Sequence, residues 1–120
     1  MESTRAEALA ARSQNARTRL GSALVAARVL TAEGRAGEAT KRLEAVLAEA
    51  RGKGLVLLEY EARLALAEAE LASGRTSAAR ERLKVLEEEA RARGLSGFVR
   101  KAEALDNALR GGGPREAAPR

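Results

Sequence analysis

The chain repeats itself at an interval of 40 residues, and this repeat limits the possible folds more than any other feature. Gly34-Arg35 is matched by Gly74-Arg75, and small and apolar residues match around it. The matching positions include Leu24 with Leu64, Ala27 with Ala67, Ala39 with Ala79, and Leu43 with Leu83. A period of this size with helical spacing predicts a stacked array of helix pairs, because one pair cannot bury its apolar faces alone.

Glycines mark the expected helix ends. Gly54 and Gly94 occupy equivalent positions, and each is followed by a leucine. Glycine is favoured at the left-handed residue that closes a helix, and an apolar residue after it packs back on the last turn. We therefore expect the two leucines to lie near Ala50 and Ala90.

Helix starts are less clearly marked. Thr4 with Glu7 matches a capping box, and the segment from 4 to 33 is either one helix or a short helix that ends near Asn15 followed by a second; we favour the single helix slightly. Thr76 or Ser77 is expected to cap the fourth helix, and Ser96 the fifth.

The predicted third helix, residues 57–71, carries apolar residues over two adjoining faces. One face holds Leu57, Tyr60, Leu64, Ala67 and Leu71, and the other holds Leu58, Ala62, Ala65, Leu66 and Ala69. So wide an apolar stripe predicts burial against two neighbours. Tyr60 is expected in the core with its hydroxyl in water.

The predicted organisation is one helical domain over residues 1–110. Repeat units span about 17–55 and 57–95, a capping helix spans 97–110 with one apolar and one polar face, and residues 111–120 form a flexible tail. The expected class is all-α, with antiparallel hairpins stacked as a short right-handed α-solenoid of about five helices.

Composition narrows the chemistry. The chain has no cysteine and no histidine, which removes disulfides, thiolate chemistry, the usual zinc sites and the commonest general base. We therefore expect no catalytic residues, no cofactor and no metal, and hence no enzyme. No apolar run approaches a membrane span, and the N-terminus lacks a signal-peptide core, so we expect no membrane association and a cytoplasmic location.

The net charge of +5 raises the question of nucleic acid. Acidic residues stand four positions before basic ones, as in Glu59 with Arg63 and Glu38 with Arg42, which is typical of a solvated helix face. An arginine-rich N-terminal region keeps nucleic-acid binding as the weaker alternative. Its arginines are Arg5, Arg12, Arg17, Arg19 and Arg28.

The repeat resembles the tetratricopeptide repeat family, in its longer variant of about 40 residues. Small residues at the helix crossing (Ala27, Ala67) and early in the second helix (Ala39, Ala79) carry the resemblance. Ala23 and Arg63 stand where the family often has tryptophan, and Leu30 and Glu70 where it often has tyrosine. The resemblance implies a non-enzymatic interaction module or scaffold; such units also occur in the sensor or oligomerisation domains of bacterial transcriptional regulators.

The resemblance further implies a groove lined by the first helix of each unit, which receives a peptide, helix or partner subunit. The polar residues expected to contact the partner are Arg17, Arg28, Glu61, Glu68, Arg100 and Lys101. The N-terminal side has no preceding repeat, so Leu9 and Leu20 are expected to lie open, and the first helix is expected to pair with a second copy or another domain.

Overall fold

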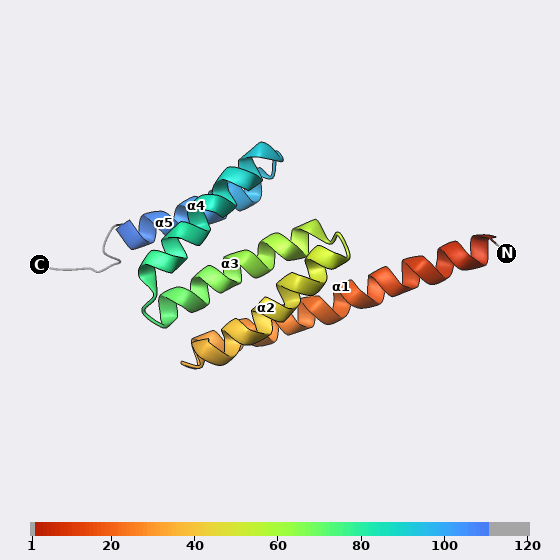
Figure 1. The fold of residues 1–120 in the computed structure, drawn as a ribbon, viewed down its shortest axis with the longest axis horizontal. Coiled ribbons are helices and arrows are strands. Elements are labelled where there is room, and N and C mark those ends of the chain that lie inside the picture. Colours follow the sequence, from red (N-terminus) through yellow and green to blue (C-terminus); the bar gives the residue numbers. More distant parts are fainter. Residues whose placement is uncertain (1, 111–120) are drawn as a thin grey trace, which may run out of the picture.

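The computed structural model describes residues 2–110, which form five helices with no strand among them (Figure 1). The helices are α1 (Glu2–Ala32), α2 (Ala36–Gly52), α3 (Val56–Ala72), α4 (Thr76–Ala92) and α5 (Ser96–Arg110). Consecutive helices form antiparallel hairpins, so the predicted all-α class and the helix number are confirmed. The expected tail, residues 111–120, lies outside the described residues.

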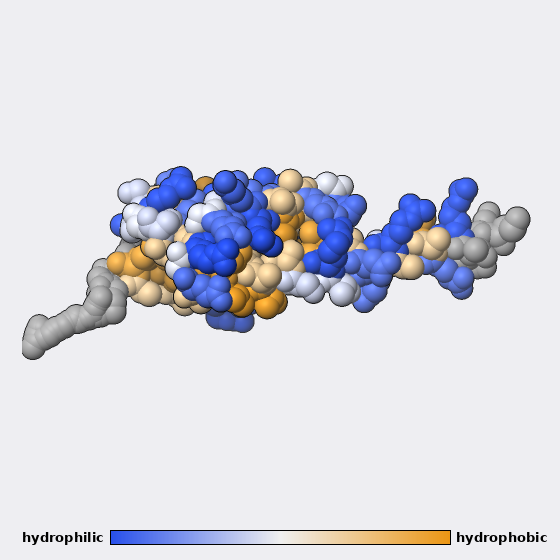
Figure 2. All heavy atoms as spheres, turned by 90° about the horizontal axis from the view of Figure 1, so that it is seen from below, coloured by the Kyte–Doolittle hydropathy of each residue, from blue (hydrophilic) through white to orange (hydrophobic). Residues whose placement is uncertain are grey.

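A single helix, α1, covers the segment for which one or two helices were considered. Its start at Glu2 lies two residues before the predicted capping position at Thr4. Gly21 lies inside the helix, where a glycine costs about 1 kcal/mol relative to alanine without breaking it. Residues 5–15 are exposed on all sides and project beyond the body of the molecule (Figure 2).

The four helix ends share one hydrogen-bonded turn. At the end of α2, Gly54 has a positive φ of 68°, its N–H donates to the Arg51 carbonyl at 3.2 Å, and the Leu55 N–H donates to the Ala50 carbonyl at 2.9 Å. These are the two bonds of a Schellman motif. The same motif occurs at Gly34, Gly74 and Gly94. The predicted stops at Gly54 and Gly94 are thus confirmed.

The predicted side-chain caps of α4 and α5 are wrong. Arg75 is the N-cap of α4 and makes no side-chain capping bond, so Thr76 is already helical, and Ser96 is the first residue of α5. The Schellman turn leaves a single residue between the glycine and the next helix. At α4 that residue is Arg75, whose carbonyl accepts the first helical bond, from the Ala79 N–H at 3.0 Å.

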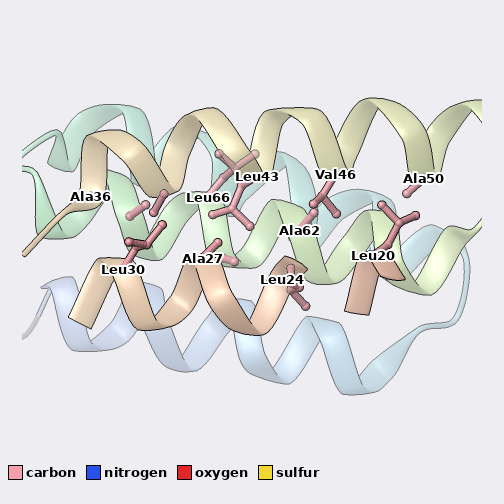
Figure 3. Close-up of a cluster of buried hydrophobic side chains, with 13 residues drawn as sticks. Leu20, Leu24, Ala27, Leu30, Ala36, Leu43, Val46, Ala50, Ala62 and Leu66 are labelled. Carbon is pink, nitrogen blue, oxygen red and sulfur yellow. The ribbon is translucent and has the colours of Figure 1, made fainter. Parts of the chain in front are cut away.

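The α3 helix is the middle of the array, as its wide apolar stripe predicts. The face with Leu66 packs into a cluster with α1 and α2 (Figure 3), and the face with Tyr60 and Leu64 packs into a second cluster with α4 and α5. Leu57, which was expected on the same buried face as Tyr60 and Leu64, is instead 60% exposed. Its equivalents forty residues away, Arg17 and Gly97, are exposed too, so this repeat position points outward.

Tyr60 lies in the core, but its hydroxyl does not reach water. The residue is 0% exposed, its ring centroid lies 5.6 Å from that of Phe98, and its hydroxyl has no hydrogen-bond partner among the described residues. The prediction of a solvated hydroxyl is wrong because α5 and the Arg63 and Arg93 guanidinium groups, 5.0 and 5.8 Å from the ring centroid, close over the ring.

A candidate partner-binding groove

A cavity of about 420 Å³ opens along the side of the array formed by α1, α3 and α5. Its apolar part is lined by Leu64 of α3 together with residues of α5, and charged residues stand at its edge. The lining residues are Arg28, Leu64, Glu68, Lys101, Ala104, Leu105 and Ala108. These three helices are the first helices of successive units, so the cavity lies on the predicted side of the array.

Arg28 joins α1 to α3 at the edge of this cavity. Its Nε lies 3.2 Å from Glu68 Oε1 and its Nη1 lies 3.6 Å from Glu61 Oε1. The Arg28 and Glu68 side chains are 37% and 38% exposed. Stacked repeats place equivalent residues side by side, which is why two residues forty positions apart form this pair.

Lys101 occupies the same relation to Glu68 that Glu61 has to Arg28, one unit further along. Both Lys101 and Glu68 line the cavity, yet no ion pair joins them. The Lys101 ammonium lies 5.3 Å from the Phe98 ring centroid, and within residues 2–110 it has no carboxylate at ion-pair distance. The cavity between α3 and α5 therefore has a cation available at its edge.

The structure brings together four of the six predicted contact residues and leaves two apart. Arg28, Glu68 and Lys101 line the cavity, and Glu61, which does not line it, pairs with Arg28. Arg17 is exposed on α1, eleven residues before Arg28 or roughly 16 Å along the helix, and donates to Gln14 at 3.3 Å. Arg100 is exposed on α5 and does not line the cavity. Contact of any of the six with a partner stays a prediction.

Buried charges on the opposite side of α3 were not predicted. Arg63 is 4% exposed and donates from Nη1 to Glu89 at 2.6 Å, whereas the sequence indicated a solvated position. Glu70 is 5% exposed and accepts two bonds from Arg82, at 3.0 and 3.1 Å. These pairs line a second cavity of about 440 Å³, where the charges already satisfy one another.

The repeat itself carries a signal for these burials. Forty residues earlier, Ala23 and Leu30 occupy the positions of Arg63 and Glu70. An apolar residue at an equivalent position indicates that the site faces the interior. A charged residue at such a position needs an oppositely charged partner nearby, because an unpaired buried charge destabilises the fold.

The prediction that Leu9 and Leu20 lie exposed on the N-terminal side is correct for only one of them. Leu9 is 54% exposed as expected, whereas Leu20 is only 2% exposed, because the α2 and α3 side chains of the first cluster cover it (Figure 3). The other exposed large apolar residues of α1 are Val25 and Val29, at 61% and 49%.

Two of the N-terminal arginines already pair with carboxylates of other helices. Arg28 binds Glu61 and Glu68, and Arg19 donates to Glu49 of α2 at 2.9 Å. This hydrogen bond raises the pKa of Arg19 and lowers the pKa of Glu49. Because Arg19 and Arg28 are neutralised in this way, the five N-terminal arginines do not form one continuous phosphate-binding stripe. This weakens the nucleic-acid alternative.

Between residues 2 and 110 no group of three or more acidic side chains is arranged to hold a metal ion. No helix in that range combines the length and the apolar character needed to cross a membrane.

Comparison with known proteins supports the same family as the repeat. A protein-family model described as tetratricopeptide repeat matches residues 30–95, which is more than half of the chain. A search of curated proteins and a search of solved structures found no match. The matched region covers α2, α3 and α4 and the turns that join them. The chain belongs to the tetratricopeptide repeat family.

Proposed function

We propose that the chain is a non-enzymatic protein-binding module that receives a peptide or a partner helix in the groove between α1, α3 and α5. Tetratricopeptide repeats generally mediate protein–protein interactions, and the groove has what such binding needs. Leu64, Leu105 and Ala108 offer apolar surface, and charged groups surround it. Affinity then comes from apolar burial and selectivity from the charges at the edge.

The observation that carries this proposal is the cavity between α3 and α5, with the Lys101 ammonium at its edge. Arg28 pairs with two carboxylates, whereas Lys101 has none within ion-pair distance among residues 2–110. A partner segment that places a small apolar side chain over Ala104 and Ala108 can bring a carboxylate to the Lys101 ammonium. We expect the bound segment to carry an acidic residue next to its apolar anchor.

Blocking the groove is expected to abolish binding without unfolding the protein. Segments are first selected from a random peptide display on the wild-type chain, and their affinity is then measured by fluorescence anisotropy. Ala108→Arg places a long side chain in the cavity from an exposed position, so we expect affinity to fall at least about tenfold. Lys101→Glu is expected to weaken acidic segments most, by like-charge repulsion.

A matched control keeps the test specific to the groove. Ala45 is an exposed alanine on α2, and Ala45→Arg adds the same side chain outside the cavity. Circular dichroism checks that the variants keep their helix content. Equal loss of affinity in Ala45→Arg and Ala108→Arg, or unchanged affinity in Ala108→Arg, would contradict the proposed groove.

We also propose that the N-terminal helix pairs with a second copy of the chain. The exposure of Val25 and Val29 supports this, since large apolar side chains that share a helix face are commonly covered by a partner. The projecting residues 5–15 support it as well, because all of them are exposed and no other helix of the described chain covers them.

A further inference from the structure

The outer face of α1 is bare where the same face of α3 is covered. Val25 and Val29 are 61% and 49% exposed, whereas Ala65 and Ala69, forty residues later, are 1% and 0% exposed. Ala65 and Ala69 belong to the cluster that includes α2 side chains. In this family of stacked units, α1 therefore presents a packing face that no element of the described chain occupies.

This face continues along the whole helix as a row of exposed residues, which we call the outer row. Its members follow one another at steps of three or four residues and so lie on one side of α1. The outer row is Glu7, Ala11, Gln14, Thr18, Ser22, Val25 and Val29, all exposed. The steps are the same in both directions from Thr18, so the row is symmetrical about this residue.

The projecting part of α1 needs a partner for its own stability. An isolated helix of about 12–15 residues is marginal in water, and residues 5–15 are exposed on every side. The unsupported helix around Ala11 lies at one end of the outer row. The uncovered side chains of Val25 and Val29 lie at the other end.

We propose that two copies of the chain pair through their α1 helices, antiparallel, with Thr18 on the twofold axis. Ala11 of each copy then lies against Val25 of the other, and Gln14 lies against Ser22. Each projecting segment covers the bare face of its partner, so one contact satisfies both needs. The two bodies lie on opposite sides of the paired helices, because the outer row faces away from Leu20 and Leu24, which point into the core.

Charge fits this arrangement. The five arginines of α1 all lie outside the outer row, so no arginine is buried at the seam. Glu7 is the only charged residue of the row. The pairing places it against Val29 of the second copy and beside Arg28, which also pairs with Glu61 and Glu68 of its own chain. Opposite charges at the ends of a seam favour one register over others.

An end-to-end contact between the two ends of the array fits less well. On α5, the positions equivalent to the buried Tyr60 and Ala67 hold Arg100 and Asn107, both exposed. This polar face does not match the valines of α1. A twofold contact of α1 with itself also closes the assembly, whereas a head-to-tail contact would continue into a filament.

The first test is the mass in solution, by light scattering after size exclusion over a range of concentrations. This inference rests on the proposed self-association and not on the groove. Wild type is expected to approach twice the 12.7 kDa of one chain. The double variant Val25→Glu with Val29→Glu is expected to weaken pairing on the order of a hundredfold, since it buries charges at the seam.

Leu9→Glu is the matched control, because Leu9 is equally exposed but lies on the opposite side of α1 from the outer row. It is expected to leave the dimer intact. A wild type that stays monomeric at every concentration would overturn self-association altogether. A dimer that Leu9→Glu disrupts and the valine variant does not would place the contact on the side of α1 opposite the outer row. That result would overturn the proposed pairing.

The second test determines the register of the two paired α1 helices. The chain has no cysteine, so each introduced cysteine supplies the single thiol of its chain. Thr18→Cys places two thiols together across the axis, so a short thiol-specific crosslinker is expected to join most of the protein into covalent dimers. In Ser22→Cys the two thiols are eight residues apart along the seam, roughly 12 Å, and little crosslinking is expected. Equal crosslinking of both variants, or more of Ser22→Cys, would overturn the twofold at Thr18 while leaving a dimer possible.

Discussion

Leu66→Ala is expected to lower the free energy of unfolding by about 2–5 kcal/mol, the usual cost of replacing a buried leucine by alanine. Leu66 is 1% exposed, and it packs in the cluster that joins α3 to α1 and α2 (Figure 3). A domain of this size has only a small margin of stability. The loss is therefore expected to be visible at once as a lower midpoint in chemical denaturation followed by circular dichroism.

Leu57 provides the control for this substitution on the same helix. It is 60% exposed, so Leu57→Ala is expected to change the free energy of unfolding by no more than about 0.5 kcal/mol. If the two variants lost similar stability, α3 would not be the buried middle helix that its two apolar faces indicate.

The second large effect concerns the buried carboxylate of Glu70. Arg82→Ala removes both hydrogen bonds that Arg82 donates to the Glu70 carboxylate and leaves a side chain that is only 6% exposed without its cation. Because Arg82 itself is 30% exposed and water reaches this edge, we expect a loss of about 2–3 kcal/mol rather than the full cost of an isolated buried charge. Urea denaturation of the purified variant measures it.

The internal repeat supplies both a control and a rescue. Arg42 is the equivalent of Arg82, but it is 58% exposed and pairs with Glu38 on the surface, so Arg42→Ala is expected to cost less than about 0.5 kcal/mol. Leu30 is the equivalent of Glu70, so adding Glu70→Leu to Arg82→Ala should recover most of the loss. A double variant as unstable as Arg82→Ala would show that the unpaired charge is not the cause.

The features that follow from local sequence were predictable. The glycine turns depend only on a residue that tolerates positive φ and on the helix before it, as at Gly54 and Gly94. The central place of α3 follows from the width of its own apolar stripe. In each case the signal lies within one element, and the 40-residue period shows the glycine turn twice.

The features that depend on a neighbouring helix were not predictable in the same way. Arg63 forms a local pattern with Glu59, four residues before it, which suggests a surface pair. In the fold Arg63 also donates to Glu89 of α4, a contact that the local pattern does not show. Leu20 similarly appears open in sequence, but side chains from α2 and α3 cover it in the fold.

Part of the groove was predictable because the repeat relates its residues. Arg28 and Glu68 occupy equivalent positions, and stacking units bring equivalent positions together. The register of the repeat does not say how far the groove extends along each helix, so Arg17, Glu61 and Arg100 were included although they do not line the cavity.

Amide hydrogen exchange followed residue by residue tests the central claim most directly, namely that neighbouring helix pairs bury one another around α3. Amides of residues 62–69 are expected to exchange more slowly than any others in the described chain, at rates set by global unfolding, because this segment is packed on both faces. Exchange of this segment as fast as that of α5, which is the last described helix of the array, would contradict the account.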